Sequence, residues 1–251
     1  MRNEAKHDTP FTRTRHRTNP SITFENFVIG SSNEIAHSSA VRVVELPISQ
    51  SGPLFIYGGV GLGKSHLLNA VGNRLMEINS QANVCYIHAT NFISETVRAL
   101  ESKNLGEMRQ YFQSLDLLLI DDIQYLADKP NTQHELIATL NYLVESDKLV
   151  VMTSNASSKR LSGFDPQILS RFSGVLSVAV TKPKLNTRRD ILLSKAELSG
   201  IDIRKDVASY MAMRVTSSVR DLEGAINRID AYARFHSRAI TIDLAKEALL
   251  I

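Results

Sequence analysis

The sequence predicts an α/β fold, in which a parallel five-stranded sheet covered on both faces by helices is followed by a small all-helical lid domain. Five short aliphatic runs lack the polar alternation of half-exposed strands, which indicates strands buried on both faces. These runs are Leu54–Tyr57, Val84–His88, Leu117–Ile120, Leu149–Thr153 and Val175–Val180. Helix-length segments lie between them, at Ser65–Met76, Phe92–Leu100 and Thr132–Val144.

After Val180 the strand pattern stops and only helices are predicted. They are Thr187–Leu198, which Gly200 ends, Asp206–Val215, a helix that begins at Ser218, and Ile242–Leu250, which Thr241 caps. We therefore expect a disordered basic arm over residues 1–19, an α/β domain over residues 20–181 and a helical lid domain over residues 182–251.

Composition excludes several classes of protein. With 43% hydrophobic and 22% charged residues in a chain of 251, wholesale disorder is excluded. No uncharged apolar run approaches the roughly 18 residues of a membrane span, and the N-terminus lacks the apolar region of a secretory signal. The single cysteine, Cys85, cannot form an internal disulfide. A cytoplasmic location is the resulting expectation.

The net charge of +3 is unevenly distributed. Residues 1–19 carry five Lys or Arg and two acids, residues 20–172 carry 11 and 15, and residues 173–251 carry 13 and 9. The last segment is therefore basic, which is compatible with binding a polyanion. An ordinary solvated helical surface explains the same charge.

A phosphate-binding motif follows the first predicted strand. Gly58–Ser65, with the sequence GGVGLGKS, matches G-x-x-x-x-G-K-[ST] and opens a helix. Glycines allow successive backbone N–H groups to surround an anion, and the helix N-terminus adds its positive dipole end. Lys64 is expected to reach the β- and γ-phosphates, and the Ser65 hydroxyl to bind Mg²⁺.

Polar residues follow two other strands of the predicted sheet. Asp121 and Asp122 end the third aliphatic run, and Asp121 comes 57 residues after Lys64 (121 − 64). Buried carboxylates are costly unless a cation or donor meets them. We expect Asp121 to bind Mg²⁺ and Asp122 to orient or deprotonate the attacking water. Asn155 follows the fourth strand, where its amide can reach the γ-phosphate or that water.

Two arginines complete the candidate site. Arg171 precedes the last strand, and Arg220 lies in the first turn of a helix of the lid domain. A positive charge at a helix N-terminus opposes the dipole. An anionic ligand is therefore expected near Arg220, unless Asp221 or Glu223 serves as an ordinary partner.

The motifs, their order and the helical ending resemble an AAA+ ATPase and, more narrowly, the bacterial replication initiator family DnaA. The resemblance runs from about Asn19 to Leu250. It is carried by FENFVIGSSN before the glycine loop, PLFIYGGVGLGKSHLLNAVGNRL, LLLIDDIQYLADK, ILSRFSGVLSVAV, SSVRDLEGAINRI and RAITIDLAKEAL.

The resemblance implies ATP or ADP and Mg²⁺ as ligands. The adenine pocket would be lined by Val28 and Ile29. The phosphates and Mg²⁺ would be held by Gly59, Gly61, Gly63, Lys64, Ser65 and Asp121, with Asp122 near the water. Asn155 takes the first sensor position, where relatives often have Asp.

The resemblance also implies roles between subunits and toward DNA. Arg171 would be an arginine finger that reaches the ATP of a neighbouring subunit, and Arg220 would be a lid sensor on its own γ-phosphate. The implied activity is slow ATP hydrolysis that switches off an ATP-dependent oligomer on single-stranded or origin DNA. A full-length initiator and a helicase are the other partners implied.

A segment between the second and third strands, residues 90–114, resembles the initiator-specific helical insertion. Val97, Arg98 and Lys103 are its candidate contacts to single-stranded DNA; an ordinary amphipathic surface helix is the alternative. The chain departs from the family at Asn131, where some relatives have an arginine that binds single-stranded DNA.

The family also has a helix-turn-helix domain after this region and a helicase-recruiting domain before it, and this sequence contains neither. Three interpretations follow: a fragment or split form of an initiator, an adaptor similar to Hda that prompts hydrolysis in an initiator, or a helicase-loader-like protein.

Overall fold

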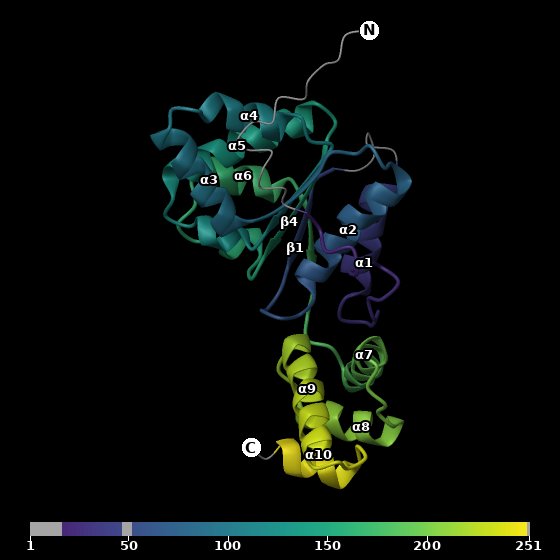
Figure 1. Ribbon diagram of the computed structural model, residues 1–251. Coiled ribbons are helices and arrows are strands. Elements are labelled where there is room, and N and C mark those ends of the chain that lie inside the picture. The colour runs from purple at the N-terminus through teal and green to yellow at the C-terminus, as the bar shows by residue number, and fades with distance from the viewer. Residues whose placement is uncertain (1–16, 47–51, 250–251) are drawn as a thin grey trace.

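The centre of the molecule is a parallel sheet of five strands (Figure 1). The computed structural model describes residues 17–46 and 52–249. The strands are β1 (Leu54–Tyr57), β2 (Val84–His88), β3 (Leu117–Asp121), β4 (Leu149–Ser154) and β5 (Leu176–Ala179), in the order β2-β3-β4-β1-β5. Every neighbouring pair is parallel. The predicted fold class is confirmed, and each strand lies where an aliphatic run predicts it.

Helices cover both faces of this sheet (Figure 1). One face carries α1 (Glu34–Glu45) and α2 (Lys64–Ile78). The opposite face carries α3 (Ala89–Glu101), α4 (Leu105–Gln113), α5 (Pro130–Glu145) and α6 (Pro166–Ser173). Short 3₁₀ helices occupy Ile123–Leu126 and Ser158–Arg160. The sequence predicts α2, α3 and α5 but does not separately identify α1, α4 and α6.

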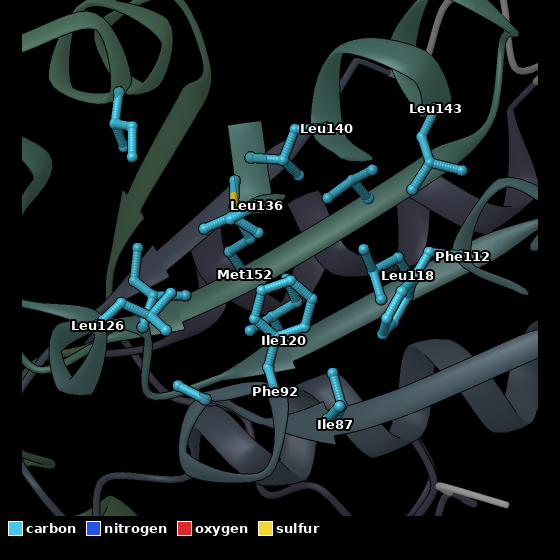
Figure 2. Close-up of a cluster of buried hydrophobic side chains, with 14 of the residues drawn as sticks. Ile87, Phe92, Phe112, Leu118, Ile120, Leu126, Leu136, Leu140, Leu143 and Met152 are labelled. Atoms are coloured by element: carbon cyan, nitrogen blue, oxygen red, sulfur yellow. The ribbon is translucent and has the colours of Figure 1, made fainter. Parts of the chain in front are cut away.

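Two apolar cores follow from this layering, because successive residues of a strand point to opposite faces of the sheet. Figure 2 shows the core beneath α3, α4 and α5, where Leu118, Ile120 and Met152 of the sheet meet Phe92 and Leu136 of the helices. The other core packs residues such as Leu117, Leu119 and Val151 against α1 and α2. The double burial explains why the strand sequences lack polar alternation.

The lid domain is a separate group of four helices with its own core (Figure 1). They are α7 (Leu185–Leu198), α8 (Lys205–Arg214), α9 (Val219–Phe235) and α10 (Ile242–Leu249). The core includes Leu192, Met211, Leu222, Ile229 and Leu244. Ser218 caps α9 by accepting a hydrogen bond from the Asp221 amide at 3.1 Å. The predicted helical ending is confirmed.

The last residues of the predicted disordered arm are ordered in the structure. Residues 1–16 lie outside the described residues, whereas Thr18 and Asn19 pack on α2. The Thr18 hydroxyl donates to Asn73 Oδ1 at 2.5 Å, and the Asn19 amide donates to Asn69 Oδ1 at 2.8 Å. The two asparagines of α2 thus order this stretch, which the composition of residues 1–19 does not predict.

No helix within residues 17–46 and 52–249 has the length and apolar character needed to cross a membrane.

Candidate functional site

A pocket of about 490 Å³ lies between the glycine loop, the carboxyl ends of the strands and the lid domain. The predicted site residues that line it are Val28, Gly61, Gly63, Lys64, Ser65, Asp122, Asn155 and Arg220. They come from segments far apart in the sequence, as expected for a parallel sheet whose loops meet at one edge. Proteins of the α/β class bind their ligands at this edge of the sheet.

The glycine loop needs glycine for two reasons. Gly61 and Gly63 have φ values of 71° and 100°, a left-handed conformation that residues with a Cβ rarely adopt. A Cβ on Gly61 would also lie 3.0 Å from Ser218 Oγ and 3.1 Å from Arg220 Cβ. Gly63 precedes the first residue of α2, so the partnerless first amides of that helix lie next to the loop. The arrangement suits an anion.

Lys64 brings a buried positive charge to this loop. The side chain is 5% exposed, and Nζ donates to the Gly59 carbonyl oxygen at 3.0 Å. Burial lowers the pKa of Lys64, while the carboxylates of Asp122 and Asp121 raise it and Arg220 lowers it further. An ammonium with three donors and a single carbonyl partner gains hydrogen bonds from an anionic ligand.

Asp121 is the last residue of β3 and is 3% exposed. Hydroxyl groups of two neighbouring strands hold its carboxylate. The Tyr86 hydroxyl donates to Oδ2 at 2.7 Å, and the Thr153 hydroxyl donates to Oδ1 in a short hydrogen bond. The carboxylate is therefore fixed in place beside the pocket.

Asp122 leaves the strand in a left-handed conformation, with φ 57°. Its amide donates to Thr153 Oγ1 at 2.8 Å, and its Oδ1 accepts from Gln124 Nε2 at 3.0 Å. Gln124 Oε1 in turn accepts from the Asn155 amide at 3.1 Å. His88 Nε2 lies 3.6 Å from Asp122 Oδ2. Gln124, which sequence reasoning missed, thus links the two predicted polar residues, and its only local signal is its place two residues after Asp122.

The other end of the pocket is formed by the segment before α1 and by α7. Phe27, Val28 and Ile191 line it. The Asn33 side chain holds the loop by accepting from the Gly30 amide at 2.8 Å and donating to the Val28 carbonyl at 3.0 Å. Sequence reasoning missed the roles of Phe27 and Asn33, although both lie in the quoted stretch FENFVIGSSN. This end suits a flat, mostly apolar base.

Besides Asp121, which lies beside the pocket, two predicted residues of the nucleotide site lie outside the pocket lining. Ile29 is 53% exposed and does not line the pocket beside Val28. Gly59 takes part in the site through its carbonyl oxygen, which accepts a hydrogen bond from Lys64 Nζ. The adenine contact of Ile29 stays a prediction.

The lid meets the glycine loop at the start of α9. The amides of Val219 and Arg220 donate to the Gly61 carbonyl oxygen at 2.9 and 3.3 Å. Neither acid suggested as an ordinary partner of Arg220 forms an ion pair with it within the described residues. Asp221 accepts from the hydroxyls of Ser217 and Ser218, both at 2.6 Å, and Glu223 pairs with Lys195 of α7 at 2.7 Å. Arg220 therefore remains available to a ligand in the pocket, while Lys195 and Glu223 are lining residues that sequence reasoning missed.

Arg171 lies apart from this pocket. It is an exposed residue of α6 and borders a different groove, which Leu140, Val144 and Gln167 also line. The structure therefore does not bring Arg171 together with the other predicted site residues of the same chain.

The residues present fit a nucleotide with its magnesium ion. Within the described residues, no group of three or more His, Cys, Asp or Glu side chains could hold a metal alone. Mg²⁺ in nucleotide sites takes one or two protein oxygens and completes its shell with phosphates and water. The Asp121 carboxylate and the Ser65 hydroxyl, which follows the buried Lys64, are the protein oxygens that suit this pattern.

Comparisons with protein families match almost the entire described chain. Residues 18–179 match the family described as the bacterial DnaA ATPase domain, and residues 186–249 match the lid domain of Hda. The chromosomal replication initiator protein DnaA of Paraburkholderia phymatum is 44% identical over 238 residues, which cover 95% of this chain and 46% of that protein. The chain spans about half the length of the curated relatives it matches.

Solved structures agree with this result. Domain III of the Thermotoga maritima replication initiation protein DnaA has a TM-score of 0.88 and 35% identity, covering 92% of this chain and 97% of that one. A replication initiator DnaA bound to AMPPCP and single-stranded DNA has a TM-score of 0.79 and 32% identity, covering 88% of this chain and 69% of that one.

Proposed function

Because the chain belongs to the bacterial DnaA ATPase-domain family, we propose that it is the ATP-binding core of a replication initiator, working in the cytoplasm as an ATP-controlled switch. The single observation that supports the proposal most is the pocket in which Lys64, Asp122 and Arg220 converge from three separate parts of the chain. The relative bound to AMPPCP makes an adenine nucleotide the expected ligand. We further propose that residues 20–181 and 182–251 act as two domains that close on this nucleotide.

In this proposal the protein holds ATP by its two ends. The base lies against Val28 and Phe27, and the phosphates lie on the glycine loop, where Lys64 donates to the β- and γ-phosphate oxygens. Ser65 and Asp121 hold Mg²⁺, which when bound neutralises charge on these phosphates.

Hydrolysis then depends on the polar strand ends. Asp122 orients the attacking water and accepts its proton, while Asn155 hydrogen-bonds to the water or the γ-phosphate. The water oxygen forms a bond to the γ-phosphorus, the bond to the bridging oxygen breaks, and ADP and phosphate leave. Arg220 stabilises the γ-phosphate from the lid of the same subunit.

Binding is tested by calorimetry on the purified chain with ATP and ADP in the presence of MgCl₂. We expect saturable binding of one nucleotide per chain. Absence of nucleotide binding by folded protein would contradict the proposal.

Assembly and hydrolysis depend on Arg171, which is exposed and outside the pocket of its own chain. We propose that it acts on the ATP of a neighbouring subunit, a contact worth about 10³–10⁵ in rate in other NTPases. Arg171→Ala should bind ATP normally but lose hydrolysis, whereas Arg160→Ala, at another exposed arginine, should behave as the wild type.

A mixing experiment sharpens this test. Lys64→Ala keeps Arg171 but lacks the phosphate-binding lysine, so neither variant should hydrolyse ATP alone. A mixture of Lys64→Ala with Arg171→Ala should recover activity, because one supplies the arginine and the other the bound ATP. Full activity of Arg171→Ala alone would contradict an action in trans.

We also propose that the ATP-bound oligomer engages DNA, since a matched relative is described as bound to single-stranded DNA. Val97, Arg98 and Lys103, at the end of α3 and just after it, are the proposed contacts. Fluorescence anisotropy of labelled single strands should show cooperative binding with ATP and weaker binding with ADP.

The match of residues 186–249 to the lid domain of Hda favours a second candidate, an adaptor that stimulates hydrolysis in an initiator. The two candidates differ in a simple assay. Stimulation of a full-length initiator's ATPase without DNA affinity of this chain supports the adaptor, and ATP-dependent DNA binding by this chain alone supports the initiator core.

A further inference from the structure

Tyr86 lies on the strand next to Asp121 and reaches its carboxylate diagonally. In the register of β2 and β3, Tyr86 lies opposite Leu119 and His88 lies opposite Asp121. Tyr86 and Asp121 are therefore diagonal neighbours on the same face, a separation that an aromatic side chain can bridge. The phenol oxygen lies 2.7 Å from Asp121 Oδ2.

The direction of this hydrogen bond is determined by the proton on Tyr86. The ordinary pKa of a tyrosine phenol lies well above neutral pH. The phenol is therefore protonated at neutral pH and donates to the carboxylate.

Together with Thr153, Tyr86 leaves the carboxylate one orientation. Tyr86 holds Oδ2 and Thr153 holds Oδ1, and the donors come from the strands on either side of β3. Rotation of the carboxylate would break both hydrogen bonds inside a buried environment, where an unsatisfied polar atom is costly. The lone pairs not used by these donors remain for a ligand.

We propose that Tyr86 is a positioning residue, whose hydroxyl holds the Asp121 carboxylate in the orientation that receives Mg²⁺ beside the bound nucleotide. The inference rests on the proposed function, since it requires a nucleotide that brings Mg²⁺ to Asp121. It adds a buried hydroxyl from β2 to a site whose lining comes from the segment before α1, the glycine loop, the residues that follow β3 and β4, and the lid.

Tyr86→Phe tests the role because it removes one hydroxyl and keeps the ring. Groups that orient a metal ligand typically change metal affinity by about 10- to 100-fold when they are lost. We therefore expect the MgCl₂ concentration that half-saturates tight ATP binding to rise by about 10-fold or more. ATP binding measured in EDTA should match that of the wild type, since Tyr86 lies outside the pocket lining.

Tyr111→Phe is the matched control. Tyr111 is a half-buried residue of α4 whose phenol forms a hydrogen bond with Cys85. It packs against the core on the opposite face of the sheet. The same loss of a hydroxyl there should leave the Mg²⁺ titration unchanged. Thermal unfolding of both variants shows that each is folded at the assay temperature.

A double-mutant cycle with Asp121→Asn separates positioning from a general effect on stability. If Tyr86 acts through the carboxylate, Tyr86→Phe should change the Mg²⁺ titration much less in the Asp121→Asn background than in the wild type. Equal effects in the two backgrounds would overturn the inference, and so would a Tyr86→Phe titration that superimposes on that of the wild type. Weaker ATP binding by Tyr86→Phe in EDTA would also overturn it.

These outcomes are distinct from failure of the proposed function. A wild-type chain that binds no ATP with or without MgCl₂ would remove both. A wild-type chain that binds ATP with Mg²⁺, together with an unaffected Tyr86→Phe, would remove the positioning role alone.

Discussion

The two walls of the pocket are held in different ways. On the α/β side, Lys64 and Asp121 are buried, and protein hydrogen bonds fix both before any ligand binds. On the lid side, α9 meets the glycine loop through two backbone hydrogen bonds to the Gly61 carbonyl, and the Lys195–Glu223 pair is partly exposed. We expect the rigid wall to recognise phosphate at any lid position and the lid wall to respond to which nucleotide is bound.

Lys64→Ala should have the largest effect, because it removes the buried charge of the rigid wall. Charged hydrogen bonds contribute about 1.5–3 kcal/mol each, so loss of two phosphate contacts should weaken ATP and ADP binding by about 100-fold or more. The free energy of unfolding should change little, because the variant no longer has to bury a charged ammonium group. Calorimetry measures the affinity, and Lys148→Ala, at an ion pair with Asp116, is the control. Unchanged ATP affinity would refute the site.

Arg220→Ala should affect the two nucleotides differently, which sharpens the contrast between the walls. A lid arginine that contacts only the γ-phosphate should lower ATP affinity by about 10- to 100-fold, the equivalent of one charged hydrogen bond, and leave ADP affinity unchanged. Arg234→Ala, at the far end of the same helix and paired with Asp230, is the control. Equal loss of ATP and ADP binding would mean that Arg220 does not distinguish them.

Gly61→Ala should disturb both walls at their point of contact. The left-handed backbone costs about 1–2 kcal/mol for a residue with a Cβ, and the added carbon would press on Ser218 and Arg220. We expect lower stability in urea unfolding and ATP affinity weaker by about 10-fold, of the order of one such cost. Gly224→Ala is the matched control, since a Cβ there meets nothing within 4 Å and lies inside α9. Undiminished stability of Gly61→Ala would contradict both the backbone strain at this position and the close contact between the loop and the lid.

Glu223→Gln should have the smallest effect. Its ion pair with Lys195 joins α9 to α7, but both side chains are partly exposed, and such pairs contribute at most about 1 kcal/mol. ATP affinity should change by less than about fivefold. A larger loss, measured in the same calorimetric assay, would show that the lid wall is as strongly preorganised as the α/β wall.

The parts of the fold that the sequence predicts are those with a strong local pattern. The strands are recognisable because both faces are buried, and Gly58–Ser65 is a contiguous motif that already identifies Lys64 and Ser65. The helices α4 and α6 are short, with two buried residues each, Met108 and Phe112 in one, Ile168 and Phe172 in the other. A helical period is recognised over a window of about 11–18 residues, and these helices, of nine and eight residues, are shorter than that window.

The unpredicted site residues share a different property: their roles depend on tertiary contacts. Gln124 matters because it reaches Asn155 on another strand, and Tyr86 because the register of β2 brings it diagonal to Asp121. Lys195 lines the pocket only because α7 packs next to α9. In each of these pairs the two residues are more than ten positions apart along the chain. A local sequence pattern therefore cannot predict the contact. The roles of the motif residues can be predicted from the sequence, whereas the roles of the residues that support them become visible only in the folded structure.

The left-handed backbone at Asp122 has a consequence for any chain that shares this pair of acids. Neighbouring residues of a continuous strand face opposite sides of the sheet, so two consecutive aspartates would serve two different layers. Here β3 ends at Asp121, and Asp122 adopts a left-handed backbone conformation. Asp122 therefore lines the pocket, and Asp121 is held beside that same pocket. Asn and Gly tolerate that conformation, whereas a β-branched residue does not. The backbone, as much as the carboxyl group, thus restricts which residues this position can accept.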